Sequence, residues 1–197
     1  MAERMASEFR REGLGWGPHF QQQLSLQEYE QCRPGRILQQ HKSQLQVATE
    51  AGLIELPVSS TMPAVVAGDW LLLDNEGHYL RLLDRFSLFS RKAAGSKVQT
   101  QLIAANVDTA FVVTSINQDF NLSRIERYLT LVHEAGVEPV VVLTKADLSD
   151  DVESCTKAVQ SLDPTLMGAT LAEKRSRDKA LGKFYRTVLS ESRRRKL

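Results

Sequence analysis

Residues 140–150 read VVVLTKADLSD, an apolar run that ends in Thr144, Lys145, Ala146 and Asp147. Such a run is typical of a buried strand with polar side chains at its carboxyl end, where nucleotide sites lie in open α/β sheets. A T-K-x-D tetrad there indicates guanine recognition, with Asp147 accepting from the ring N1–H and the exocyclic amine. The stem of Lys145 would lie along the ring face, and Thr144 would fix the loop through its hydroxyl. We take these four residues as the candidate nucleotide-binding site; the alternative is an ordinary polar turn.

The residues around this run predict a β-α-β unit. Residues 107–115 (VDTAFVVTS) form a continuous apolar strand, and residues 121–136 (NLSRIERYLTLVHEAG) form an amphipathic helix. Residues 137–148 (VEPVVVLTKADL) supply the second strand, so the crossover between the two parallel strands should be right-handed. Residues 150–162 (DDVESCTKAVQSL) predict one more helix, which ends before the turn at Asp163-Pro164.

The first of these helices carries clear local signals. Its apolar residues at helical spacing are Ile125, Leu129 and Val132. Either Asp119 or Asn121 is expected to cap its start, because short polar side chains accept from the first free backbone N–H groups. Gly136 is expected to end it.

The preceding part of the chain has a different texture. Residues 34–98 alternate short β-like pieces with tight turns at Gly68-Asp69 and Asn75-Glu76-Gly77. This pattern predicts a small β-barrel, and the OB-fold is a barrel of this size that commonly binds oligonucleotides. An SH3-like or other small barrel without a nucleic-acid role is the alternative. Residues 1–33 are a polar leader, in which Ser25 and Glu28 have the spacing of a helix capping box.

The barrel region offers a candidate RNA-binding surface. Its basic residues are Arg36, Lys42, Arg91 and Lys92, and a wider set adds His41, Arg81 and Arg85. OB-type domains pair such charges with stacking aromatic side chains, and Trp70, Phe86 and Phe89 are available. Because Trp70 is followed by Leu71 and Leu72, we expect Trp70 to fill the core instead.

Composition narrows the class of protein. The chain of 197 residues is 42% hydrophobic and 25% charged, as is ordinary for a globular protein. No apolar stretch approaches the roughly 20 residues of a membrane span, and the first residues lack the apolar region of a signal peptide. The two cysteines lie far apart and the four histidines are scattered, so no metal site and no catalytic residue is predicted. We expect a cytoplasmic, monomeric protein with reduced thiols and no membrane partner.

The charge is unevenly distributed. Residues 171–197 hold ten Lys or Arg and three Asp or Glu, which leaves 15 basic and 21 acidic residues in 1–170. Such a basic block suggests a helix or tail that meets phosphate or an acidic surface. A solvated helix with a basic end explains the same composition.

Phosphate binding lacks its usual motif. The sequence contains no G-x-x-x-x-G-K-[ST], the loop whose backbone N–H groups and lysine cradle nucleotide phosphates. Gly95-Ser96-Lys97 precedes a predicted strand rather than following one, so it reads as a linker. We therefore expect no GTP hydrolysis by this chain.

Several stretches together resemble one family, the ribosome small-subunit-dependent GTPase A family, RsgA (also called YjeQ). They are residues 14–20 (LGWGPHF), 34–49 (PGRILQQHKSQLQVAT), 66–70 (VAGDW), 91–129 (RKAAGSKVQTQLIAANVDTAFVVTSINQDFNLSRIERYL) and 144–148 (TKADL). Residues 171–186 (LAEKRSRDKALGKFYR) also resemble the terminal helix of some members.

The resemblance implies an OB domain, then a circularly permuted GTPase domain, then a zinc-binding domain. In the permuted order the guanine motif precedes the P-loop, and Thr144, Lys145 and Asp147 match that motif. The family implies GTP or GDP with Mg²⁺, a zinc ion, and the small (30S) ribosomal subunit with its 16S rRNA as partner. This chain departs from the pattern between residues 164 and 170, where it passes directly to the terminal helix without the P-loop, switch motifs or zinc ligands.

These observations predict an α+β multidomain chain. Its segments are a leader (1–33), an OB-fold-like barrel (34–98), a partial permuted GTPase domain (99–168) and a basic C-terminal helix or tail (169–197). The predicted function is that of an RsgA-type GTPase of small-subunit biogenesis, with impaired GTP binding in this chain. The alternative is a non-enzymatic RNA- or ribosome-binding module that uses the barrel and the tail.

Overall fold

The computed structural model describes residues 10–92, 100–164 and 166–170, so the predicted basic tail lies outside the described residues except for Ala169 and Thr170. The chain divides into two compact units, and the boundary falls between Val107 and Asp108. The sequence placed this boundary at residue 98. The difference arises because β7 (Thr100–Ala105) pairs antiparallel with β6 (Leu88–Lys92), which keeps both strands in the first unit.

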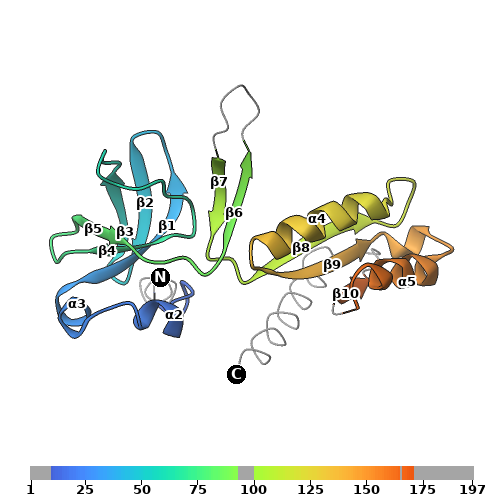
Figure 1. The fold of residues 1–197 in the computed structure, drawn as a ribbon, viewed down its shortest axis with the longest axis horizontal. Helices are drawn as coiled ribbons and strands as arrows, with labels where there is room; N and C mark the ends of the chain where they lie inside the picture. Colours follow the sequence, from blue (N-terminus) through green and yellow to red (C-terminus); the bar gives the residue numbers. More distant parts are fainter. Residues whose placement is uncertain (1–9, 93–99, 165, 171–197) are drawn as a thin grey trace, which may run out of the picture. The chain divides into compact units, whose positions relative to one another are not determined.

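The first unit contains a five-stranded antiparallel sheet in the order β3-β2-β1-β4-β5 (Figure 1). Its strands are β1 (Arg33–Gln40), β2 (Gln44–Thr49), β3 (Gly52–Pro57), β4 (Trp70–Leu73) and β5 (Tyr79–Leu82). The predicted small β domain is therefore present as an antiparallel sheet. Short turns join β1 to β2, β2 to β3 and β4 to β5, and Gly77 adopts a positive φ of 91° in the last of these turns.

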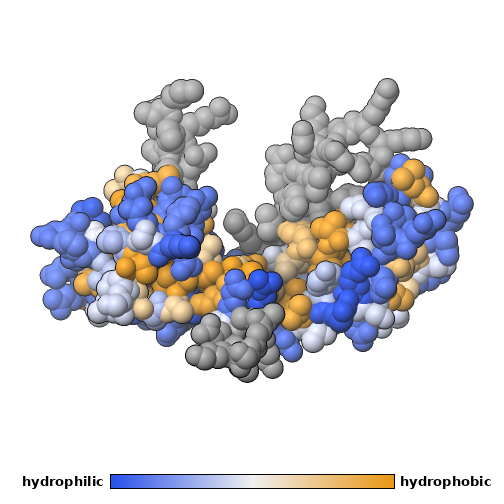
Figure 2. Space-filling view, turned by 90° about the horizontal axis from the view of Figure 1, so that it is seen from above, coloured by the Kyte–Doolittle hydropathy of each residue, from blue (hydrophilic) through white to orange (hydrophobic). Residues whose placement is uncertain are grey.

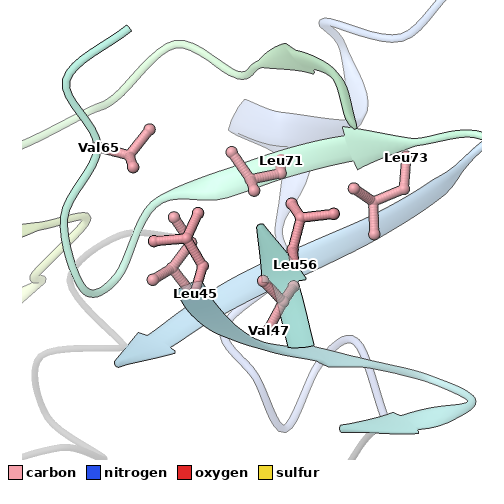
Figure 3. Packing of buried hydrophobic residues seen from close by; sticks show 7 residues of the cluster. Leu45, Val47, Leu56, Val65, Leu71 and Leu73 are labelled. Carbon is pink, nitrogen blue, oxygen red and sulfur yellow. The ribbon is translucent and has the colours of Figure 1, made fainter. Parts of the chain in front are cut away.

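One hydrophobic core cluster packs on one face of this sheet (Figure 3). Its buried members are Ile37, Leu45, Val47, Leu56, Val65, Leu71 and Leu73. The alternation in β2 explains why: Leu45 and Val47 point inward while Gln44 stays exposed, as the period of two in a strand requires. Side chains from the edge strands β3 and β5, including Ile54 and Leu82, pack against the same cluster, so the sheet curls around one core.

A second core cluster lies on the other face of β4. Phe20, Trp70, Leu72 and Leu83 form it, with Trp16 packed edge-on to Trp70 at 4.9 Å between ring centroids. Phe20 comes from the short helix α2 (Pro18–Gln21). All four β4 residues are buried because alternate side chains enter the two clusters. The prediction that Trp70 fills the core is confirmed by its exposure of 0%.

The predicted capping box at Ser25 is also confirmed. Ser25 caps helix α3 (Leu26–Gln31): its hydroxyl accepts from the backbone N–H of Glu28, and the Glu28 carboxylate accepts from the backbone N–H of Ser25. The same carboxylate accepts from Arg81 Nε at 2.9 Å, which ties α3 to β5. These bonds, that from Arg81 foremost, lower the pKa of Glu28 from its ordinary 4.5 to about 2.

Acid should therefore weaken this link in a defined pH window. The pKa of Glu28 is lower in the folded chain than in the unfolded one, so its contribution to stability is complete above pH 4.5 and is lost as the pH falls towards about 2. A carboxyl-detected NMR titration should find the Glu28 midpoint near 2, and Arg81→Met should move it upward. An ordinary midpoint in the unsubstituted chain would contradict the ion pair.

The second unit contains the predicted β-α-β unit. Its elements are β8 (Thr109–Ser115), α4 (Leu122–Glu134), β9 (Glu138–Thr144), the 3₁₀ turn η1 (Ala146–Leu148), α5 (Val152–Leu162) and β10 (Met167–Thr170). The strands are parallel in the order β10-β9-β8. Helix α4 packs against β8 and β9, and α5 packs against β10 and α4.

The strand β10 was not predicted. The α/β domain was expected to end between residues 164 and 170. In the structure, however, Met167 pairs with Val140 and Thr170 pairs with Leu143. Four residues are too few to show a strand period in sequence. These four residues pair with the open edge of β9, so β9 is the central strand of the described sheet.

The helix signals were read correctly. Asn121 caps α4 by accepting from Arg124 N–H, and Ile125, Leu129 and Val132 are its buried residues. Gly136 follows the helix with a φ of 72°, and the N–H of Val137 donates to the carbonyl of Val132, as in a Schellman ending. Local chemistry therefore determines where α4 begins and ends.

The surface of the described residues mixes polar and apolar side chains (Figure 2). Val113, in β8, is 61% exposed and Leu80, in β5, is 49% exposed. No helix among residues 10–92, 100–164 and 166–170 is long and apolar enough to cross a membrane.

Candidate guanine-nucleotide site

The T-K-x-D tetrad lies at the carboxyl end of β9. Thr144 is the last residue of the strand, and its hydroxyl donates to the carbonyl of Thr114 on β8 at 3.1 Å. In return, the N–H of Ile116 donates to the carbonyl of Thr144 at 2.9 Å. These two bonds hold the ends of β8 and β9 together.

Lys145 turns the chain at this point. It adopts the left-handed conformation, with φ 58° and ψ 33°, directly before η1. That conformation costs a residue with a Cβ about 1–2 kcal/mol, and such strain tends to occur at functional sites. The N–H of Leu148 closes the turn on the carbonyl of Lys145 at 3.0 Å. The turn leaves Asp147 exposed beyond the sheet edge, where its carboxylate can accept from a ligand.

A second polar loop ends the neighbouring strand. The hydroxyl of Ser115 donates to Asn117 Oδ1 at 2.8 Å, and the N–H of Asp119 donates to the same oxygen at 3.0 Å. Because β8 and β9 are parallel, this loop and the tetrad share one edge of the sheet. Ser115 and Asn117 were not among the predicted site residues, although polar residues at and just after the end of an apolar strand are the signal that could have indicated them.

The candidate RNA-binding residues divide into two groups. Arg36 serves the interior: it donates to the carbonyls of Leu14 and Asn106, and its guanidinium lies 5.9 Å from the centre of the Trp70 ring. Lys42, in the β1–β2 turn, is exposed. Arg91 is exposed on β6, where its Nε donates to Gln101 at 2.9 Å, and Lys92 is opposite Thr100 at the end of that strand. From the wider set, Arg81 and Arg85 both form internal ion pairs.

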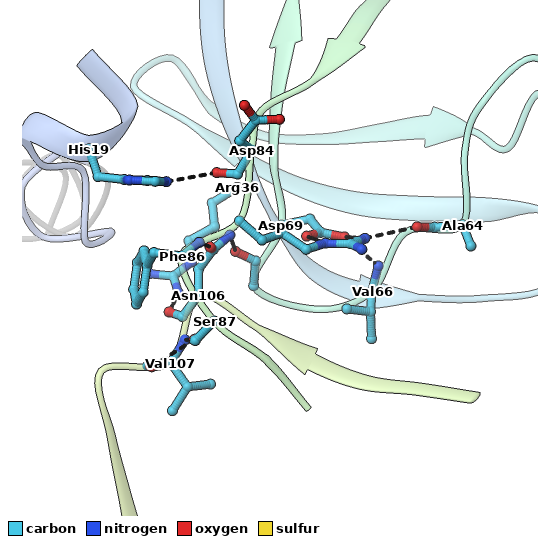
Figure 4. A network of polar contacts seen from close by, with 12 residues as sticks. His19, Arg36, Ala64, Val66, Asp69, Asp84, Phe86, Ser87, Asn106 and Val107 are labelled. Carbon is cyan, nitrogen blue, oxygen red and sulfur yellow. Dashed lines mark hydrogen bonds and ion pairs between the residues drawn. The ribbon is translucent and has the colours of Figure 1, made fainter. Parts of the chain in front are cut away.

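A buried polar network anchors the end of the first unit (Figure 4). Asn106 is 2% exposed; its Oδ1 accepts from the N–H of Phe86 at 3.1 Å and its Nδ2 donates to the carbonyl of Gly68 at 3.0 Å. Ser87 Oγ accepts from the N–H of Val107 and donates to the carbonyl of the same residue. One asparagine thus ties three chain segments together, which nothing in its sequence neighbourhood indicated.

A second network surrounds Asp69 (Figure 4). This carboxylate is fully buried and accepts two bonds from Arg85, at 2.6 and 2.7 Å, and one from the N–H of Val66 at 2.8 Å. Arg85 also donates to the carbonyl of Ala64. The hydrogen bond to Asp69 raises the pKa of Arg85 above its ordinary value. The pair therefore joins the loop before β4 to the segment that follows β5.

The family resemblance implies a zinc ion and Mg²⁺, and the ligands expected for these ions can be compared with the described residues. Cys32 and Cys155 belong to different units, and no Cys/His cluster occurs among the described residues. Mg²⁺ is usually held through nucleotide phosphates, and the sequence lacks the G-x-x-x-x-G-K-[ST] loop that would position them. The described residues therefore hold no Cys/His zinc cluster and the sequence holds no phosphate-binding loop of the kind that the resemblance implies, so no chemical step is assigned to either ion.

Solved structures define the class of this fold. YloQ, described as a circularly permuted GTPase, superposes with a TM-score of 0.57 at 18% identity, over 81% of this chain and 57% of that one. YjeQ from Thermotoga maritima superposes with a TM-score of 0.55 at 20% identity, over 72% and 52%. At these identities the likeness concerns the fold alone: the chain shares the fold of somewhat more than half of each of these two proteins.

Sequence comparison then gives the family. The RsgA GTPase family model matches residues 82–184. The small ribosomal subunit biogenesis GTPase RsgA 2 of Vibrio parahaemolyticus is 58% identical over 158 residues, which cover 80% of this chain and 44% of that protein. RsgA of Xylella fastidiosa strain M23 is 46% identical over 143 residues, covering 67% and 42%. The chain belongs to the RsgA GTPase family, as its motifs predicted, and spans less than half the length of these relatives.

Proposed function

We propose that this chain acts in biogenesis of the small ribosomal subunit, the role stated in the names of its relatives, and recognises guanine nucleotides through Thr144, Lys145 and Asp147. One observation supports the site most strongly: the tetrad ends the central strand of a parallel sheet, with Lys145 held in a strained left-handed turn. In this proposal the first unit is an OB-type domain that contacts 16S rRNA, and the chain works as a cytoplasmic monomer.

The chemistry of the base explains the specificity. Guanine offers an N1–H and a 2-amino group on one edge, and a single carboxylate can accept from both. Adenine has neither donor at these positions, so it cannot form these two hydrogen bonds with the carboxylate of Asp147. Lys145 would cover the ring face with its aliphatic stem, while Ala146 supplies the small side chain that lets the turn approach the base.

The affinity should be low. Two charge-assisted hydrogen bonds contribute about 1.5–3 kcal/mol each, and a dissociation constant of 1 mM corresponds to about 4.1 kcal/mol. Without a phosphate-binding loop in this sequence, base contacts carry most of the binding. We expect a millimolar dissociation constant for GDP and no measurable GTP hydrolysis.

Asp147→Asn tests the site directly. The amide can donate to a carbonyl at position 2 of the base, so binding should move from GDP to xanthosine diphosphate, with about a tenfold loss or more for GDP. Titrations followed by ¹H–¹⁵N NMR should show shifts at residues 144–148 with GDP and not with ADP. Asp150→Asn, which removes an equally exposed charge three residues on, should bind GDP unchanged. Equal responses to GDP and ADP in the folded chain would refute the proposal.

A non-enzymatic RNA- or ribosome-binding module is the second candidate. It is favoured by the exposure of Lys42 and Arg91, which leaves both cations accessible to phosphate. Its signature would be binding to small subunits that falls steeply with salt and ignores added nucleotide.

A further inference from the structure

The β4–β5 turn gathers three side chains of metal-binding type. Within the five residues 74–78 (DNEGH), Asp74, Glu76 and His78 direct their ligand atoms to one place, and these atoms all lie within 4.8 Å of one another. His78 Nδ1 lies 3.0 Å from Asp74 Oδ2 and 3.6 Å from Glu76 Oε2. No other such group occurs among the residues that the structure describes.

These separations suit a small divalent ion. Zinc binds imidazole nitrogen and carboxylate oxygen at about 2.0–2.2 Å, so ligand atoms of a tetrahedral site stand roughly 3.3–3.5 Å apart. The two distances from His78 bracket that value. Glu76 is 81% exposed and His78 is 70% exposed, so both side chains can adjust by rotation and solvent can supply a further ligand.

Backbone hydrogen bonds orient the Asp74 carboxylate without a bound ion. Asp74 Oδ1 accepts from the N–H groups of Glu76 and His78, at 2.9 and 2.8 Å, which leaves Oδ2 directed at the imidazole. The N–H of Asp74 donates to the carbonyl of His78 at 3.0 Å, and the N–H of Gly77 donates to the carbonyl of Asp74 at 3.2 Å. The loop is therefore closed at both ends, which lowers the entropy lost on binding.

We propose that Asp74, Glu76 and His78 form a binding site for a divalent transition-metal ion of the zinc class. The imidazole distinguishes this group from an acidic surface patch, because nitrogen donors favour zinc and its neighbours, while Mg²⁺ and Ca²⁺ prefer oxygen ligands alone. The site differs in its ligands and its place from the Cys/His zinc cluster that the family resemblance implies. It does not depend on the proposed guanine site, which belongs to the other unit.

The test is a titration of the full 197-residue chain with Zn²⁺, followed by ¹H–¹⁵N NMR. Amide signals of residues 74–78 should shift and saturate with Zn²⁺, and Mg²⁺ at the same concentrations should leave them unchanged. His78→Ala and Glu76→Gln should each weaken this local binding about tenfold or more. Both side chains are exposed, so neither change disturbs the core. The location of the signals separates this site from zinc bound at Cys155, and the two variants separate it from zinc bound at Cys32, which lines one pocket together with Asn75.

His41→Ala is the matched control. His41 is an exposed histidine in another β-turn of the same unit, and its loss should not change the response of residues 74–78. A Zn²⁺ response at residues 74–78 that persists with unchanged affinity in both Glu76→Gln and His78→Ala would overturn the proposal, as would no response at these residues in the unsubstituted chain.

Discussion

Replacing Gly68 with alanine should destabilise the first unit by about 2–5 kcal/mol. Gly68 has a φ of 96°, and a Cβ added there would lie 2.0 Å from the carbonyl oxygen of Ala105. The positive φ costs about 1–2 kcal/mol, and forcing an atom into a packed site costs about 1–3 kcal/mol more. Urea unfolding monitored by Trp16 and Trp70 fluorescence measures the change, because both tryptophans lie in this unit.

Gly77→Ala separates the two causes. Gly77 has nearly the same φ, 91°, but a Cβ there would meet nothing within 4 Å. Its loss should therefore cost only the conformational part, about 1–2 kcal/mol. The additional loss of stability at Gly68 measures the effect of the close approach between the turn before β4 and the end of β7. Equal effects of the two substitutions would show that this approach contributes nothing.

Arg85→Met should be the second large change, at about 3–5 kcal/mol, because it leaves the buried Asp69 carboxylate without its counter-ion. Asp69→Asn should cost less: the amide oxygen can still accept from Val66 N–H, and Arg85, whose side chain is 19% exposed, can turn towards water. Thermal unfolding of both variants gives the comparison. The double substitution Arg85→Met with Asp69→Leu should recover most of the loss.

Arg81→Met provides the control for Arg85→Met. Arg81 also pairs with a carboxylate, but both partners are partly exposed, at 38% and 29%. Water can replace most of this interaction, so the loss should be small. If the two arginine variants unfold at the same temperature, burial of Asp69 is not what makes its ion pair important.

The sequence could predict elements that rest on local chemistry. The apolar run before Thr144, the cap at Asn121 and the capping box at Ser25 each involve residues within four positions of one another. The hydrogen bonds of the two caps form within one turn of the chain, so the local sequence is sufficient to predict them. The candidate guanine site belongs to this group, because its four residues are consecutive.

Partners distant in the sequence could not be predicted in this way. Arg81 meets Glu28 across 53 positions, and Arg36 meets Asn106 across 70. A sequence shows that an arginine is charged but not whether its partner is a carboxylate of the same chain or a phosphate. Arg36 was thus a candidate for RNA binding because of its charge. In the structure its guanidinium donates hydrogen bonds to the carbonyls of Leu14 and Asn106.

Periodicity, caps and motifs act over a few residues, so they were enough to predict the family, the parallel β-α-β unit and the place of the T-K-x-D tetrad. Three features emerged only from the folded chain: residues 167–170 join β9 as a third strand, the first unit extends to Val107, and some basic residues are exposed while others are paired inside. Each of these outcomes depends on an edge, a buried carboxylate or a carbonyl supplied by a distant segment, and such a partner exists only once the chain has folded.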